Sequence, residues 1–296
     1  MIETSQNIAA RVEASFPFRV EKFPLAGPDN MPTDLYGLWR VGADGMEHVG
    51  NAVKRGYEPH QTDDVVALVE AASQVFGESS LRCSWRQGHH VIIEPTQDQR
   101  RAIYGTDDCI FPRVYISAGY GGKPFSGSLG FYRDACRNLA MLRSVSKVSF
   151  SVKHTHKLRR CMSELVDSFG RIAESWPAVV AAAQQMERQR CNIESFLGSI
   201  YGLPEGSSDR TAGNYEKKIN RIISRIAKER LKLGRDMGDD TDTASGWELF
   251  NAVQGYEQHD ARRKGKPSDM DRIVQTMQTG SAANRITLAE RLALSV

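Results

Sequence analysis

The sequence predicts an α+β protein: an N-terminal mixed or antiparallel sheet with one or two packed helices, followed by a largely α-helical C-terminal half. Short apolar runs of strand length fill the first half, and helical spacing dominates after residue 157. The length of 296 residues is about twice the ~150 residues typical of one domain. We therefore expect an extended N-terminal arm over residues 1–33, an α+β sheet domain with a basic strand over 34–156, and a helical region over 157–296.

Prolines and glycines divide the first 120 residues into short elements. Four prolines between residues 17 and 32 predict the extended arm. Glycine-broken aromatic and apolar residues over 34–57 predict two or three short strands, with a hairpin turn at Ala43-Asp44-Gly45. Apolar spacing over 62–77 predicts an amphipathic helix that ends at Gly77. Further strands are expected over 81–86, 90–94 and 114–118.

The middle and the C-terminal half show both periodicities. A helix is expected over 132–143, after a glycine-rich loop. Residues 147–156 then alternate strictly, with Val148, Phe150 and Val152 on one strand face and lysines and hydroxyls on the other. Helical spacing resumes at residue 157 and predicts helices up to 201 and over 215–233, 246–259, 269–278 and 286–294.

Charge is unevenly distributed along the chain. Residues 1–130 hold 12 Lys and Arg against 16 Asp and Glu, whereas residues 131–296 hold 27 against 20. Within residues 133–160, eight cations accompany a single acid, Asp134. Positive charge concentrated in this way favours a polyanionic partner, although a solvated basic face gives the same pattern.

The alternating strand is the strongest candidate for a binding surface. Lysines neutralise phosphates, and hydroxyl groups donate hydrogen bonds to phosphate oxygens. Neighbours on one strand face stand about 6.6 Å apart, close to the spacing of phosphates along a single strand. The alternative is a solvent-facing edge strand whose lysines prevent aggregation. The residues expected to bind nucleic acid are Arg133, Arg137, Lys147, Ser149, Ser151, Lys153, Thr155, Lys157, Arg159 and Arg160.

A second candidate lies on the helix expected over 246–259. Trp247, Asn251, Gly255 and His259 recur every four residues and so share one stripe. A glycine in mid-helix costs about 1 kcal/mol, which indicates that another group approaches closely there. The stripe is either a packing face for another helix or a ligand site in which Trp247 stacks and Asn251 forms hydrogen bonds.

No motif for a cofactor, a metal or a catalytic group is complete. The glycine-rich loop that ends at Lys123 lacks the spacing of a Walker nucleotide-binding loop. His154 and His156 share a strand face, but no second pair of ligands has zinc-site spacing. We therefore expect no cofactor and no metal. A binding protein is favoured over an enzyme, and an enzyme with a cryptic site is the third alternative.

The composition favours a cytoplasmic protein. Five cysteines, at positions 83, 109, 136, 161 and 191, are odd in number and widely spaced, which indicates reduced thiols. No run approaches the ~18 apolar residues of a membrane helix, so we expect no membrane partner. The N-terminus lacks the basic and apolar regions of a secretion signal.

Three blocks of the sequence are distinctive: Asp134–Leu139, Lys153–Thr155 and Ala244–His259, the last with its Trp, Asn-Ala-Val, Tyr and His residues. Together they resemble a family known as the phage/plasmid-like proteins, a domain of unknown function borne by bacteriophages and plasmids. Tyr57-Glu-Pro59 matches an early Tyr-x-Pro of that family, whereas Cys136-Arg-Asn-Leu139 departs from its usual Cys-x-Asn-Gly. The resemblance covers roughly residues 45–260. It implies an origin in a mobile element of bacteria, and no activity.

Two classes of function follow. The first is a phage-encoded, ATP-independent protein that binds single-stranded nucleic acid, DNA in preference to RNA, and anneals strands in recombination as a homo-oligomer. The second is a phage interaction protein that binds and inhibits a host defence or replication protein. Salt-dependent binding to short oligonucleotides separates the first class from the second.

Overall fold

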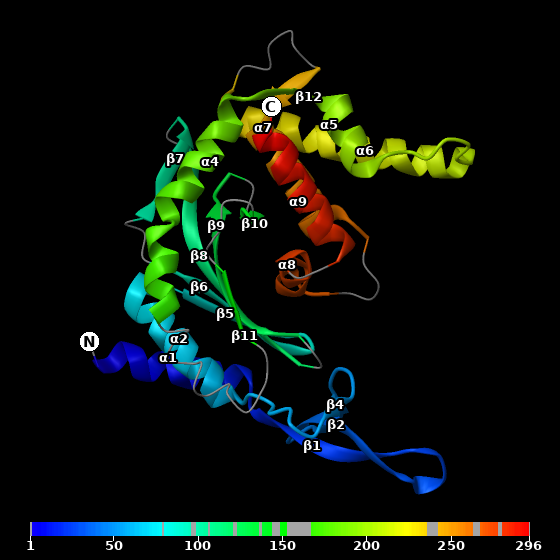
Figure 1. Cartoon of the computed structure of the whole chain (residues 1–296). Coiled ribbons are helices and arrows are strands. Elements are labelled where there is room, and N and C mark those ends of the chain that lie inside the picture. The colour runs from blue at the N-terminus through cyan, green and yellow to red at the C-terminus, as the bar shows by residue number, and fades with distance from the viewer. Residues whose placement is uncertain are drawn as a thin grey trace. The chain divides into compact units, whose positions relative to one another are not determined.

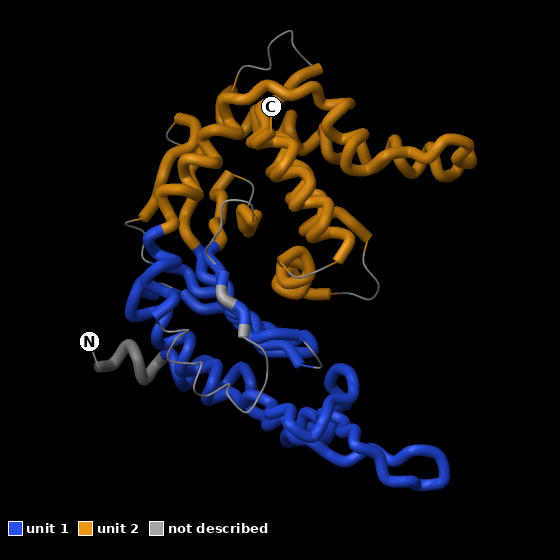
Figure 2. The backbone as a smooth tube through the Cα atoms, viewed as in Figure 1, with its two compact units in different colours: residues 1–97, 113–129, 148–174 blue, residues 98–112, 130–147, 175–296 orange. Residues whose placement is uncertain are grey.

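The structure is a computed structural model, and it confirms a mixed α+β chain with antiparallel sheets. It describes residues 2–295 except 79, 96–98, 106, 121–122, 136–137, 144–148, 153–166, 236–241, 263–266 and 278–279. Two compact units divide the chain (Figure 2). Unit 1 contains residues 1–97, 113–129 and 148–174, and unit 2 contains residues 98–112, 130–147 and 175–296. The chain therefore crosses between the units several times, and a single boundary near residue 157 does not separate them.

Residues 1–33 do not form the extended arm that their prolines predict. They contain helix α1 (Ile2–Ser15), strand β1 (Phe18–Ala26) and the short 3-10 helix η1 (Pro28–Asn30). Strand β1 pairs antiparallel with β2 (Pro32–Gly42), and the register shifts between Pro24 and Ala26. A proline lacks the N–H that a regular strand pair needs, so Pro24 lies where the pairing is irregular. The prolines thus mark breaks between and within paired elements.

The short strands expected over residues 34–57 are confirmed. Strands β3 (Gly45–His48) and β4 (Val53–Lys54) both pair antiparallel with β2. Gly42 pairs with Gly45, so Ala43 and Asp44 form a two-residue hairpin loop. Gly45 has a φ of +106°, a conformation that favours glycine.

Helix α2 (Thr62–Phe76) confirms the helix expected over 62–77. Its N-cap is Gln61, and the Gln61 side chain and the Asp64 carboxylate form a reciprocal capping box. Gly77 follows the last turn, as predicted. The apolar face of α2 packs against α1 and strand β6 (Gly88–Glu94), so α1 and α2 cover the sheet of unit 1 that contains β6 (Figure 1).

The main sheet confirms the strands expected between residues 81 and 118. Its order is β10–β9–β8–β6–β5, with β11 paired to β9 and β7 paired to β8. Unit 1 holds the β5–β6–β8 pairing and the β9–β11 pairing, whereas unit 2 holds the pairings of β7 and β10. The bounds are β5 (Ser80–Trp85), β6 (Gly88–Glu94), β7 (Arg101–Tyr104), β8 (Asp108–Gly119), β9 (Phe125–Arg133), β10 (Asn138–Ala140) and β11 (Ser149–Val152).

The helix expected over 132–143 is wrong. Strand β9 continues to Arg133, and β10 pairs antiparallel with its last residues. Contacts far along the chain stabilise β10: the Leu139 carbonyl accepts hydrogen bonds from the side-chain amides of Gln254 and Gln258. Asn138 donates to the Asn251 carbonyl at 2.8 Å. Tertiary hydrogen bonds therefore override the local helical spacing.

The largely helical character of the C-terminal half is confirmed. Residues 167–174 are helical, and α7 packs against α4, α6 and α9 within unit 2. No helix in the described ranges has the length and apolar character needed to cross a bilayer. The elements of unit 2 after residue 175 are α4 (Trp176–Arg188), β12 (Arg190–Asn192), α5 (Ile193–Tyr201), α6 (Asp209–Lys232), β13 (Thr243–Ser245), α7 (Gly246–Gly255), the π-helical turn η3 (Tyr256–Asp260), α8 (Asp269–Met277) and α9 (Ser281–Leu294).

Candidate functional site

Helix α6 carries a stripe of positive charge. Its members lie at positions i, i+4, i+7 and i+11, and so share one helix face. Helix α6 also packs against α7, and its residues Ile222 and Ile226 are buried. At a rise of 1.5 Å per residue the stripe is about 17 Å long. We name this set the α6 basic stripe: Arg221, Arg225, Lys228 and Lys232.

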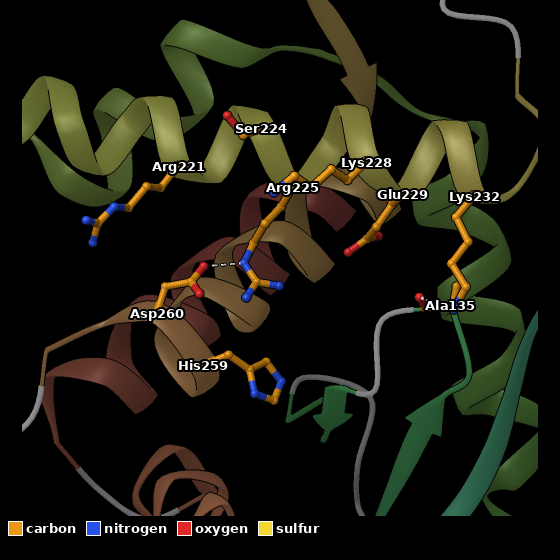
Figure 3. Close-up of a pocket in the computed structure, with 9 residues that line it drawn as sticks. All are labelled: Ala135, Arg221, Ser224, Arg225, Lys228, Glu229, Lys232, His259 and Asp260. Carbon is orange, nitrogen blue, oxygen red and sulfur yellow. Dashed lines mark hydrogen bonds and ion pairs between the residues drawn. The ribbon is translucent and has the colours of Figure 1, made fainter. Parts of the chain in front are cut away.

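The α6 basic stripe forms one wall of a pocket of about 710 Å³ in unit 2. The turn η3 supplies the facing side chains, His259 and Asp260, and Ala135 lies at the end near Lys232 (Figure 3). Ser224 and Glu229 complete the lining. Four cations face two carboxylates, so the pocket carries an excess of positive charge that suits an anion.

Two contacts fix the positions of stripe residues. The Arg225 Nε donates to Asp260 Oδ2 at 2.5 Å, which ties α6 to η3. The Lys232 Nζ donates to the Ala135 carbonyl at 2.9 Å and keeps its charge, because a carbonyl does not neutralise it. Arg221, Lys228 and Lys232 remain exposed. Their ammonium and guanidinium groups are accessible to a ligand in the pocket.

The Arg225 side chain passes close to α7 at Gly255. A Cβ at residue 255 would lie 2.7 Å from Arg225 Nη1 and 3.1 Å from Asn138 Oδ1. The close approach expected from this mid-helix glycine is therefore made by an arginine side chain of α6. The glycine allows Arg225 to reach Asp260.

Gly255→Ala should weaken anion binding in this pocket about tenfold, because the new methyl group displaces the Arg225 guanidinium. The free energy of unfolding should change by less than about 1 kcal/mol, since the higher helix propensity of alanine offsets the shift of a flexible side chain. Titration calorimetry and urea unfolding measure the two effects.

Gly213→Ala on α6 is the matched control, because a Cβ there meets no atom within 4 Å. It should stabilise the protein by about 0.5–1 kcal/mol and leave binding unchanged. Unchanged anion binding by Gly255→Ala would show that the position of Arg225 does not matter.

Two polar atoms of the pocket lining are buried without a hydrogen-bond partner among the described residues. They are His259 Nε2 and Glu229 Oε1. The other oxygen of Glu229 accepts a hydrogen bond from Arg133. Burial, and then the charge of Arg225, lower the pKa of His259 below its ordinary value. His259 is therefore an uncharged hydrogen-bonding group at neutral pH.

Arg133 belongs to the interior of unit 2, so its predicted place on an exposed basic surface is wrong. It is fully buried and donates to Asp108 through Nε at 2.6 Å and Nη2 at 3.0 Å. Its Nη1 donates to Glu229. A buried arginine needs such carboxylate partners, and these lie 25 and 96 residues away in the sequence.

The stripe expected over Trp247, Asn251, Gly255 and His259 divides into two parts. Trp247 and Asn251 are fully buried, where Trp247 donates to Asp108 and Asn251 donates to the Trp247 carbonyl. This part packs in the core of unit 2. Only His259 lines the pocket, because it lies in η3 and not in α7. The wider π-helical turn rotates it away from the line of an α-helix.

Most of the expected basic strand lies outside the described residues. Of the remaining predicted nucleic-acid contacts, only Ser149 and Ser151 are described, on β11 of unit 1, and both are exposed. Their shared exposure agrees with the predicted alternation. The residues outside the described ranges are Arg137, Lys147, Lys153, Thr155, Lys157, Arg159 and Arg160, together with His154 and His156.

Other cavities in the described parts of the chain suit an anion less well. A pocket of about 730 Å³ in unit 1 is lined by Glu13, Glu21 and Asp63 against a single cation, Arg19. A pocket of about 280 Å³ in unit 2 shares Ala135 and Lys232 with the α6 pocket, and its other charged residues are Arg100, Asp107 and Asp134. Among the described residues, no three His, Cys, Asp or Glu side chains gather as metal ligands would.

The comparisons with known proteins identify a family. A family model described as a domain of unknown function (DUF932) matches residues 50–286. The chain belongs to this family. No curated protein and no solved structure is detectably similar to it. The DUF932 match includes every residue that lines the α6 pocket, whereas α1 and strands β1 to β3 precede it.

The α6 basic stripe was not anticipated from the sequence, although a signal for it exists. Its four cations recur at helical spacing within the helix expected over 215–233. The densest cluster of positive charge in the sequence lies elsewhere, at residues 133–160. The spacing of the cations on one helix face indicates the stripe, but it does not indicate the facing His259 and Asp260 of η3.

Proposed function

We propose that this protein binds single-stranded nucleic acid, without ATP, through the α6 pocket. The observation that supports the proposal most is the α6 basic stripe, with four cations on one face over about 17 Å. Its members follow one another at rises of about 6, 4.5 and 6 Å, which is comparable with successive phosphates of a strand. The origin in a phage or plasmid that the resemblance implies belongs to the same proposal.

The length of the α6 basic stripe, about 17 Å, favours a polymer over a single small anion. The smaller pocket beyond Lys232 adds Arg100 but also Asp107 and Asp134, so it does not extend the positive charge. Among the described residues, no Phe, Tyr or Trp side chain lines the α6 pocket, so phosphate neutralisation, and not base stacking, carries the binding there. Binding of this kind tolerates many base sequences and weakens in salt.

The double variant Arg221→Gln/Lys228→Gln should bind a short oligonucleotide at least tenfold more weakly than the unaltered protein. Its slope of log K against log salt concentration should be smaller by about 1.4, since two phosphate contacts to a single strand are lost. Both side chains are exposed, so the fold should persist. Fluorescence anisotropy with a labelled strand measures both quantities.

The control for this experiment is Arg188→Gln/Arg291→Gln. These two arginines are also exposed in unit 2, but they do not line the pocket. Loss of binding in both double variants would mean that only the net charge of the protein matters. Full binding by Arg221→Gln/Lys228→Gln would remove the α6 pocket from the proposal.

Protein binding is a second candidate, favoured by an apolar surface in unit 1. Residues 23–46 expose Phe23, Met31, Leu35 and Met46, of which Met31 is 65% and Met46 56% accessible. These side chains lie close together in the sequence, and exposed apolar patches are typical of protein interaction sites. The host protein expected from the sequence would be such a partner. Failure to bind any oligonucleotide at low salt would make this the leading candidate.

A further inference from the structure

The α6 pocket contains more than the groups that a phosphate needs. Figure 3 shows the Glu229 side chain leaving α6 on the pocket side, between Arg225 and Lys232, and His259 on the facing turn η3. Glu229 is 8% exposed, and its Oε1 is buried without a partner among the described residues. The Nε2 atom of His259 is also buried without a partner among the described residues. Both residues line the same cavity.

A phosphodiester alone leaves Glu229 Oε1 unsatisfied. A carboxylate oxygen only accepts hydrogen bonds, and a phosphodiester has no hydrogen to donate. The carboxylate also repels a phosphate, although its bond to Arg133 offsets this charge. A ligand that fits the whole pocket therefore carries an anionic group for the α6 basic stripe and a neutral donor for Glu229.

His259 adds an uncharged hydrogen-bonding group on the facing turn η3. Its charged neighbours are Arg225 and Asp260 at the pocket, and Asp269 and Arg272 of α8. Arg272 donates to the His259 carbonyl at 2.9 Å, which holds the backbone of η3 in place. With its pKa lowered by burial, His259 presents an uncharged imidazole that can complete a hydrogen-bonded pair with the same ligand.

We propose that the α6 pocket recognises one whole nucleotide unit, with its phosphate on the α6 basic stripe and a hydrogen-bond donor of the base or sugar on Glu229 and His259. This inference rests on the proposed function and specifies its ligand. Two donors of a nucleotide have the required chemistry: an exocyclic amino group of a base and the 2′-hydroxyl of ribose. Phosphate contacts position the strand, and the donor supplies selectivity.

Three homopolymer strands of about 12 nucleotides separate the possibilities. Deoxyribose strands of unsubstituted purine carry neither donor, deoxyadenylate strands add the amino group, and ribose strands of unsubstituted purine add the 2′-hydroxyl. At least one donor-bearing strand should bind the unaltered protein about tenfold more tightly than the donor-free strand, because the new bond reaches a charged acceptor. The strand that gains identifies the donor.

The outcomes also separate this inference from the proposed function. Equal, salt-dependent affinity for all three strands would overturn donor recognition and leave phosphate binding in place. Absence of binding by all three would overturn both. His259→Leu should reduce the tenfold advantage while keeping affinity for the donor-free strand. His48→Leu, which removes an exposed histidine of unit 1, should keep the advantage in full.

Discussion

Asp108→Ala should lower the free energy of unfolding of unit 2 by about 3–5 kcal/mol, because it removes a carboxylate that neutralises the buried side chains of Arg133 and Arg235. Asp108 is fully buried and accepts hydrogen bonds from three side chains. Arg133 donates to it twice, Arg235 donates at 3.1 Å and the Trp247 indole donates at 3.2 Å. Hydrogen exchange of the α7 amides measures the loss within unit 2, since Trp247 lies on that helix.

The control for this change is Glu205→Ala, which removes an exposed carboxylate of the same unit. It should alter the free energy of unfolding by no more than about 0.5 kcal/mol. A loss below about 1 kcal/mol in Asp108→Ala would show that the remaining carboxylates, Glu229 for Arg133 and Glu187 and Glu248 for Arg235, compensate for the loss of Asp108. The ion pairs to Asp108 would then contribute little.

Unit 1 should lose stability on mild acidification because of His89. This residue is buried among Phe16, Phe18 and Trp85, and its Nδ1 lies 2.9 Å from His60 Nε2. Burial, with a smaller effect of His90, lowers the pKa of His89 to about 3 from an ordinary 6.5. The unfolded chain therefore takes up a proton first, and stability present above pH 6.5 is lost as the pH falls towards 3. This pKa difference corresponds to roughly 5 kcal/mol of the free energy of unfolding, of which roughly 2 kcal/mol is lost by about pH 5.

His89→Gln should flatten this part of the pH profile, because glutamine does not titrate. His48→Gln, which removes an exposed histidine of the same unit, should keep the slope of the unaltered protein. Urea unfolding between pH 7 and about pH 5 measures the free energy of unfolding of each variant. Hydrogen exchange of the β6 amides reports the change within unit 1. An identical slope in His89→Gln and the unaltered protein would show that His89 does not control the acid response.

Local patterns predicted the elements whose reasons are local. Helix α2 follows from its apolar spacing and the glycine that ends it, and the β2–β3 hairpin follows from Ala43-Asp44-Gly45. The failures have distant causes. A helix over 132–143 was expected because the hydrogen bonds that Gln254 and Gln258 donate to Leu139 are not visible in its sequence. The prolines of the first 33 residues do not indicate that β1 pairs with a partner strand, β2.

The candidate site was predicted only in part. His259 was expected on a shared stripe, and it lines the pocket, but Trp247 and Asn251 of that stripe lie in the core. Arg133 was counted with its cationic neighbours along the chain, although its carboxylate partners lie 25 and 96 residues away. A charge run reports what is close in sequence, and burial depends on what is close in space. The α6 basic stripe can be predicted from the helical spacing of its cations. The facing residues on η3 can be identified only from the three-dimensional structure.

The salt dependence of oligonucleotide binding tests the central claim most directly. The affinity of the unaltered protein for a single strand of about 12 nucleotides is measured by anisotropy from about 50 to about 300 mM NaCl, without nucleotide or metal. Three or four phosphates neutralised by the α6 basic stripe predict a slope of log K against log salt concentration of roughly −2 to −3. Absence of binding at the lowest salt, or an affinity that stays constant across the range, would contradict the account.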